Sequence, residues 1–149
     1  MLGPLRLPAP SQIKPATNRA GATIPTNRLV GYGTATGNES AIDSLDVAGL
    51  GKLAGAIQHA VDNGDTIDVF DGGELVLESD GTAIIPPNTL VIAVAGASLS
   101  ASGRVTRLPA SPTPGTNYEV VGRSLNTANI AATAGLPVPT RWHRYTYQG

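Results

Sequence analysis

The stretch GDTIDVFDGGELVLES, residues 64–79, sets the fold class of this 149-residue chain. In its first half Ile67 and Val69 fall on one face, and in its second half leucines alternate with glutamates. An alternation with a period of two is the pattern of a half-buried β-strand. The tripeptide DGG at residues 71–73 is a hairpin turn signal. We therefore predict two strands joined by a turn.

Short strands and turns are predicted on both sides of this stretch. The chain holds 18 glycines and 12 prolines, which disfavour long helices and favour turns. Strand-like segments follow at residues 89–96, 104–108 and 117–121, with turn or loop residues between them. Strands at a spacing of about 8–12 residues are typical of a sandwich or barrel. We predict an all-β fold, a small barrel or sandwich formed by residues 38–149.

Residues 1–37 differ in composition from the rest. They hold five prolines, each of which fixes φ and removes a backbone donor. Four basic residues occur before the first acidic residue, Glu39. A disordered tail and an extended arm that becomes ordered on a partner both fit this composition. We predict the arm, with its basic side chains at the interface: Arg6, Lys14, Arg19 and Arg28.

A weak internal repeat bears on residues 44–64, which fit either a helix or a strand. Leucine, isoleucine and valine residues lie there at helical spacing, but three glycines oppose a helix. Aligning Gly55 with Gly122 places KLAGAIQHA over EVVGRSLNT, and Ile67 then matches Val138. Because YEVV is strand-like, the alignment favours a strand with a glycine bulge in both copies. Gly55 and Gly122 are therefore predicted to be structural.

The second copy resembles the small capsid cement proteins of tailed bacteriophages. The resemblance rests on residues 103–105, residues 120–122, Leu125 and Ala128, and covers about residues 50–140. The chain departs from that pattern at Arg123 and in its terminal RWHRYTYQG. The resemblance implies a compact β-barrel, often trimeric, that braces neighbouring capsomers on the outer face of a capsid. It implies no catalysis.

The C-terminal segment is rich in aromatic and basic residues. It fits a closing strand, a protein interface or, less well, a surface for single-stranded nucleic acid. A net charge of −1 gives no basic field to attract nucleic acid. We predict an interface with the capsid or with other copies, formed here by Arg141, Trp142, Tyr145 and Tyr147.

Other patterns give little support for chemistry. Asp62, Asp65, Asp68 and Asp71 lack the spacing of a calcium loop and are predicted to be solvated charges that discourage aggregation. The two histidines, His59 and His143, are predicted to be surface residues. The chain has no cysteine for a disulfide or thiolate metal site, and no apolar run of membrane-spanning length.

We therefore predict a structural virion protein, assembled in the host cytoplasm and located on the outer capsid surface. Its expected partners are the major capsid protein and itself, as a homotrimer, with no cofactor, metal, nucleic acid or membrane. One alternative is a tail or fibre adhesin domain that binds host glycans. A second is a small hydrolase with a cryptic site.

Overall fold

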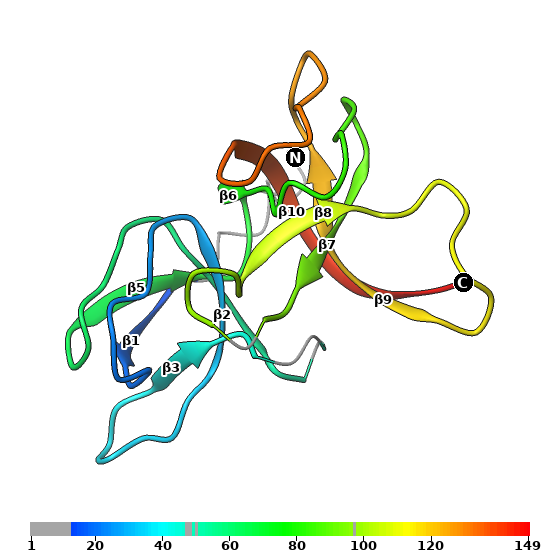
Figure 1. Ribbon diagram of the computed structural model, residues 1–149. Helices are drawn as coiled ribbons and strands as arrows, with labels where there is room; N and C mark the ends of the chain where they lie inside the picture. The colour runs from blue at the N-terminus through cyan, green and yellow to red at the C-terminus, as the bar shows by residue number, and fades with distance from the viewer. Residues whose placement is uncertain (1–12, 47–48, 50, 97) are drawn as a thin grey trace, which may run out of the picture.

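The computed structural model describes residues 13–46, 49, 51–96 and 98–149, and these residues form two groups of five strands (Figure 1). The first group is a closed barrel, here called the N-terminal barrel, with strand order β1-β3-β2-β4-β5. Its strands are β1 (Ile13–Asn18), β2 (Arg28–Tyr32), β3 (Ala41–Ser44), β4 (Leu53–Ile57) and β5 (Thr66–Phe70). The predicted all-β fold class is confirmed.

The second group is a five-stranded sheet, here called the C-terminal sheet, with strand order β6-β10-β9-β7-β8. Its strands are β6 (Glu74–Glu78), β7 (Leu90–Val94), β8 (Arg104–Arg107), β9 (Asn117–Ser124) and β10 (Pro137–Gln148). The last two strands are the longest, and they extend as a two-stranded ribbon toward the C-terminus (Figure 1).

The predicted division into an arm and one barrel is wrong for residues 13–37. These residues supply β1 and β2, two strands of the N-terminal barrel, whereas residues 1–12 lie outside the described part of the chain. Pro15 is tolerated in β1 because the parallel β1–β3 ladder begins only at Thr17, so one side of the strand has no ladder to interrupt at the proline. Pro25 lies in the connection between β1 and β2, where it breaks no strand.

The predicted turn at residues 71–73 is real, but it does not make a hairpin. β5 pairs with β1 and β4, whereas β6 pairs with β10. The DGG tripeptide therefore links the two strand groups. Its last residue is held by the C-terminal strand, since the backbone N–H of Trp142 donates to the carbonyl of Gly73 at 2.8 Å.

The two groups share one topology, so the internal repeat is real and spans nearly the whole chain. When β1 to β5 are replaced by β6 to β10, every pair of neighbouring strands in the closed barrel becomes a pair in the sheet, except that β6 and β8 are joined only through the single bridge between Ser79 and Val105. The registers also agree, because Val30 pairs with Gly55 and Val91 pairs with Gly122. A β-bulge follows Val30 in one ladder and Val91 in the other.

The strand interpretation of the ambiguous segment is correct for Leu53–Ile57, and the structure shows why glycine stands at its centre. Gly55 has φ +152°, and a β-carbon there would lie 2.5 Å from the carbonyl oxygen of Phe70. At Gly122 a β-carbon would lie 2.1 Å from the carbonyl oxygen of Arg141. Both glycines thus permit a close approach of the neighbouring strand.

Two buried clusters form the core, and β2 contributes to both. Val30 packs inside the N-terminal barrel with Ile42 and Ile57. Leu29, the preceding residue, points the other way and packs with Leu77 and other apolar residues of the C-terminal sheet. A strand buried on both faces has no polar alternation. The two strand groups are therefore joined by a continuous apolar contact.

A buried arginine lies at the junction of the two groups. Arg28 is 4% exposed, its Nη2 lies 3.0 Å from Glu78 Oε2, and its Nη1 donates to the carbonyl of Ser102 at 3.0 Å. Burial lowers the pKa of Arg28 from its usual value, and the nearby Glu78 opposes that shift. The prediction that Arg28 faces a partner is therefore wrong, because its guanidinium is used inside the chain.

Candidate functional site

The C-terminal ribbon brings together most of the predicted C-terminal residues, but on two different faces. Trp142 faces inward, packs against the core and donates from its indole Nε1 to Asp71 Oδ1 at 2.8 Å. Arg144 donates to the carbonyl of Leu53 and lies 3.4 Å from the same Asp71 carboxylate. Trp142 and Arg144 thus bind the ribbon to residues 71–73, the linker between the two strand groups, and Arg144 also binds it to the N-terminal barrel.

The outer face of the ribbon holds a shallow groove of about 500 Å³, here called the arginine groove. Arg141 of β10 and Arg123 of β9 are direct cross-strand partners, and both are exposed. Like charges at such positions repel each other. The whole lining consists of Leu90, Gly122, Arg123, Arg141, His143 and Tyr145, with no carboxylate among these residues.

The groove arginines are only lightly engaged. Arg141 Nη2 lies 3.1 Å from Glu74 Oε1, but both side chains are about two-thirds exposed, at 67% and 65%. Exposed ion pairs of this kind contribute about 0–1 kcal/mol. Arg123 Nη1 donates to the carbonyl of Asn88 at 2.9 Å. Each guanidinium carries five N–H groups, so further donors are available to an anionic partner.

Two tyrosines lie opposite each other near the end of the ribbon. Tyr118 and Tyr147 are cross-strand partners with ring centroids 6.5 Å apart. The Tyr118 hydroxyl accepts a hydrogen bond from the backbone N–H of Thr113 at 3.0 Å. Hydrogen bonding from Thr113 lowers the pKa of Tyr118. The predicted residue Tyr147 therefore belongs to an ordered aromatic pair.

The other basic residues predicted for the N-terminal arm lie in different surroundings. Arg19 pairs with Glu39 at 3.0 Å. The pKa of Glu39 is lowered to about 2, mainly by the hydrogen bond from the backbone N–H of Thr36, with a smaller contribution from Arg19. Lys14 lies at the mouth of the N-terminal barrel, where no ion pair to it is found within residues 13–46, 49, 51–96 and 98–149. Arg6 lies outside the described residues.

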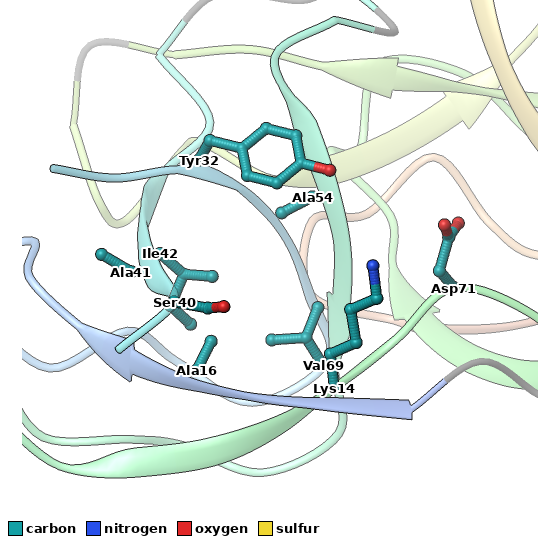
Figure 2. A pocket seen from close by; sticks show the side chains of 9 residues that line it. All are labelled: Lys14, Ala16, Tyr32, Ser40, Ala41, Ile42, Ala54, Val69 and Asp71. Carbon is teal, nitrogen blue, oxygen red and sulfur yellow. The ribbon is translucent and has the colours of Figure 1, made fainter. Parts of the chain in front are cut away.

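The mouth of the N-terminal barrel encloses a cavity of about 100 Å³. Figure 2 shows Tyr32 and Lys14 at its mouth and small apolar side chains such as Ala16 and Val69 around it. Sites for small organic ligands are usually about 300–1,000 Å³. This cavity is therefore too small for a cofactor of ordinary size.

The described residues offer neither a cluster of metal ligands nor a membrane-spanning helix. Within the part of the chain that the structure describes, no group of three or more His, Cys, Asp or Glu residues could hold a metal ion. The same residues contain no helix long and apolar enough to cross a bilayer. His59, one of the two histidines, follows β4 and is exposed, whereas His143 lies in the arginine groove.

Three further residues matter here that the sequence did not single out as interface residues: Tyr32, Arg123 and Arg144. Tyr32 is 63% exposed, but the segment holding it was taken for an arm. Arg123 was noted only as a departure from a family pattern, although its place beside the structural Gly122 put it on the outer face. Nothing in the sequence around Arg144 indicates its contacts, because they join distant parts of the chain. Its hydrogen bond to Leu53 of β4 spans 91 residues, and its ion pair reaches Asp71 in the linker.

Comparisons with known proteins give one kind of match. No protein-family model matches the chain, and no curated protein matches it. Among solved structures, the fold is similar to the N base of the head fiber gp8.5 of bacteriophage phi29, with a TM-score of 0.57. The two are 13% identical, and the match covers 93% of this chain and 99% of the other. At this identity the likeness shows a shared fold that includes both strand groups.

Proposed function

We propose that this chain is a structural protein of a bacteriophage virion, which binds the outer surface of the head and stabilises contacts between capsomers without catalysis. The observation that carries the proposal is the likeness to the base of a phage head fiber over 93% of the chain. It agrees with the independent resemblance of residues 50–140 to capsid cement proteins. A head-bound role also fits the shallow groove and the small cavity found among the described residues.

The mouth of the N-terminal barrel is the surface that we assign to the capsid. It carries one of the large side chains that remain exposed, Tyr32 at 63%. Lys14 and the exposed Lys52 lie on the same rim, since the N–H of Tyr32 donates to the carbonyl of Lys52 at 3.1 Å. Tyrosine and apolar side chains framed by charge are typical of protein interfaces.

Co-sedimentation with purified phage heads tests this assignment. The double variant Tyr32→Ala/Lys14→Ala should reduce occupancy on heads about tenfold or more, because truncating a central interface tyrosine commonly costs ~2 kcal/mol. The matched control is Ile84→Ala, since Ile84 is 49% exposed but belongs to the C-terminal half. Occupancy that is unchanged in the double variant would remove the rim from the interface.

The location of the natural chain in the virion tests the function itself. Electron microscopy of particles should show many copies on the head and none on the tail. Recovery at low copy number on tails would instead support the adhesin alternative. We also propose that copies associate as a homotrimer, for which light scattering should give a mass near three times 15.1 kDa.

A further inference from the structure

The internal repeat gives the arginine groove a counterpart in the N-terminal barrel. Each strand group contains one cross-strand row that runs over four neighbouring strands at equivalent register. In the barrel this row is Ile13, Phe70, Ala56 and Leu29. In the C-terminal sheet it is Glu74, Arg141, Arg123 and Leu90. The two rows therefore occupy the same place on the same fold.

The row in the barrel lies on a face that packs against the C-terminal sheet. Leu29 is 1% exposed and Ala56 is 0% exposed, and both pack against the apolar core of the C-terminal sheet. Phe70 is partly buried against the same cluster. The outer face of β2, β4 and β5 thus binds a second five-stranded unit within the chain.

The equivalent face of the C-terminal sheet has no such cover among the described residues. Arginines replace Ala56 and Phe70 there, and Leu90 remains as a partly exposed apolar floor. The replacement changes the face from apolar to charged while the backbone geometry is kept, and the two arginines outnumber Glu74, which pairs with Arg141 at the end of the row. A partner for it must combine a small apolar contact with negative charge.

The chain itself carries an exposed surface of negative charge. Asp62, Asp65 and Asp68 are all exposed, on the connection between β4 and β5 and on β5 itself. Asp62 accepts a hydrogen bond from Thr23 Oγ1 at 2.7 Å, but no ion pair joins the three to a basic side chain in the described ranges. We call these three residues the acidic edge.

The acidic edge cannot reach the groove of its own chain. β5 points toward the C-terminal sheet, so the connection before it lies at the far end of the barrel (Figure 1). We propose that the arginine groove binds the acidic edge of a second copy of this chain. Arg123 and Arg141 would hold the aspartates, and residues 62–68 of the neighbour would lie over Leu90 and Gly122.

This contact joins two different surfaces, so it is heterologous, and copies linked in this way close into a ring when the rotation between them permits. The inference goes beyond capsid binding and uses a different face of the molecule from the barrel mouth. The isolated protein can therefore test it without any phage head.

Charge reversal on the full-length chain is the test, read by light scattering and sedimentation. Arg123→Glu/Arg141→Glu should weaken self-association by about tenfold or more, because close charge pairs across interfaces are strongly coupled. Asp65→Lys/Asp68→Lys should do the same. The chain with all four substitutions should recover the assembly, since it restores the attraction with reversed signs. The control Arg107→Glu reverses one charge outside both surfaces and outside the barrel rim, and it should assemble normally.

Folding is checked in each variant by circular dichroism and melting temperature. All reversed residues except Arg107 are exposed, so folded variants are expected; Arg123→Gln is the milder substitution if a double variant fails to fold. A natural chain that stays monomeric at high concentration overturns the inference. So does normal assembly of either charge-reversed variant, or failure of the four-substitution chain to recover. Intact assembly with no binding to heads would instead reject the proposed function and leave this inference standing.

Discussion

Replacement of Gly122 by alanine tests how the C-terminal sheet is built. A β-carbon on Gly122 would lie 2.1 Å from the carbonyl oxygen of Arg141 and 2.8 Å from Thr140 Cγ2. The nearest atom belongs to the backbone of a paired strand, so relief requires β9 and β10 to separate beside their bulge. Added volume in a close-packed site costs about 1–3 kcal/mol, sometimes more.

For a chain of this length, such a loss should lower the melting temperature by about 3–10 °C. Differential scanning calorimetry of Gly122→Ala measures this shift, and urea unfolding gives the free energy. Gly51→Ala is the control, because nothing lies within 4 Å of a β-carbon there. Gly55→Ala should behave like Gly122→Ala, since its β-carbon meets the carbonyl oxygen of Phe70. If Gly122→Ala and Gly55→Ala have the same melting temperature as Gly51→Ala, the close approach of the strands does not constrain these positions. Our account of the repeat is then wrong.

Three further variants test the contacts that join the two halves and one loop. Arg28→Ala should lower the free energy of urea unfolding by about 3 kcal/mol, because it removes one partner of a buried ion pair with Glu78; a change below ~0.5 kcal/mol would contradict this. Trp142→Phe keeps an aromatic side chain but removes the pyrrole ring whose N–H donates to Asp71, so a cost of at least about 1 kcal/mol is expected in thermal unfolding, and no cost would contradict this. Glu39 has a pKa of about 2, below its unfolded value near 4.5, so its stabilising effect is present above pH ~4.5 and is lost as the pH falls through 2. Wild type should therefore exceed Glu39→Gln in stability at pH 6 and match it near pH 2; a constant difference would contradict the assignment.

Local patterns predicted the strands that have one polar face. The alternation around Leu75 and Leu77 gave β6, and the same pattern around Ile67 and Val69 gave β5. The strands β2 and β4 lie between two cores, so both of their faces are buried and their sequences show no alternation. The proline-rich residues 1–37 therefore suggested an arm, although residues 13–37 supply two strands of a closed barrel.

A stronger repeat than the one around Gly55 and Gly122 was present in the sequence. ATIPTNRLV at residues 22–30 and AIIPPNTLV at residues 83–91 are identical at six of nine positions. In the structure, Asn27 has φ +56° and Asn88 has φ +55°, so each copy uses its asparagine for the same left-handed turn before a strand. This match would have placed a strand at residues 28–32 and shown that the chain holds two barrel-like units.

The interface prediction for Arg28 depended on charge alone and is contradicted by its burial, whereas the same prediction for Arg19, with 32% of its side chain exposed, stays a prediction. Arg19 and Arg28 found acidic partners inside the chain, which composition cannot reveal because Glu39 and Glu78 are brought to them by the fold. Of the four residues predicted in the C-terminal segment, Arg141 and Tyr145 line the groove, and their place in an interface stays a prediction. Sequence could not separate them from Trp142, because the bulge between Trp142 and Tyr145 changes which residues face outward.

The two copies of the fold differ most at the seam between their first and third strands. In the N-terminal barrel β1 and β3 close this seam as parallel neighbours, paired at Thr17 and Asn18. In the C-terminal sheet the equivalent β6 and β8 are joined by a single bridge, Ser79 to Val105. Glu78 lies beside that bridge and binds Arg104 of β8 at 3.3 Å as well as Arg28 of the barrel.

Side-chain charge therefore supplements the weak backbone pairing at this seam, and the extra arginine comes from the other half of the chain. The backbone N–H of Leu29 also donates to the carbonyl of Gly103, next to β8, at 2.8 Å. At Gly103 a β-carbon would lie 2.2 Å from the carbonyl oxygen of Leu29, so glycine is needed for β2 to approach this closely. The second unit is thus completed by the first, and neither half contains all of the contacts that hold the C-terminal sheet together.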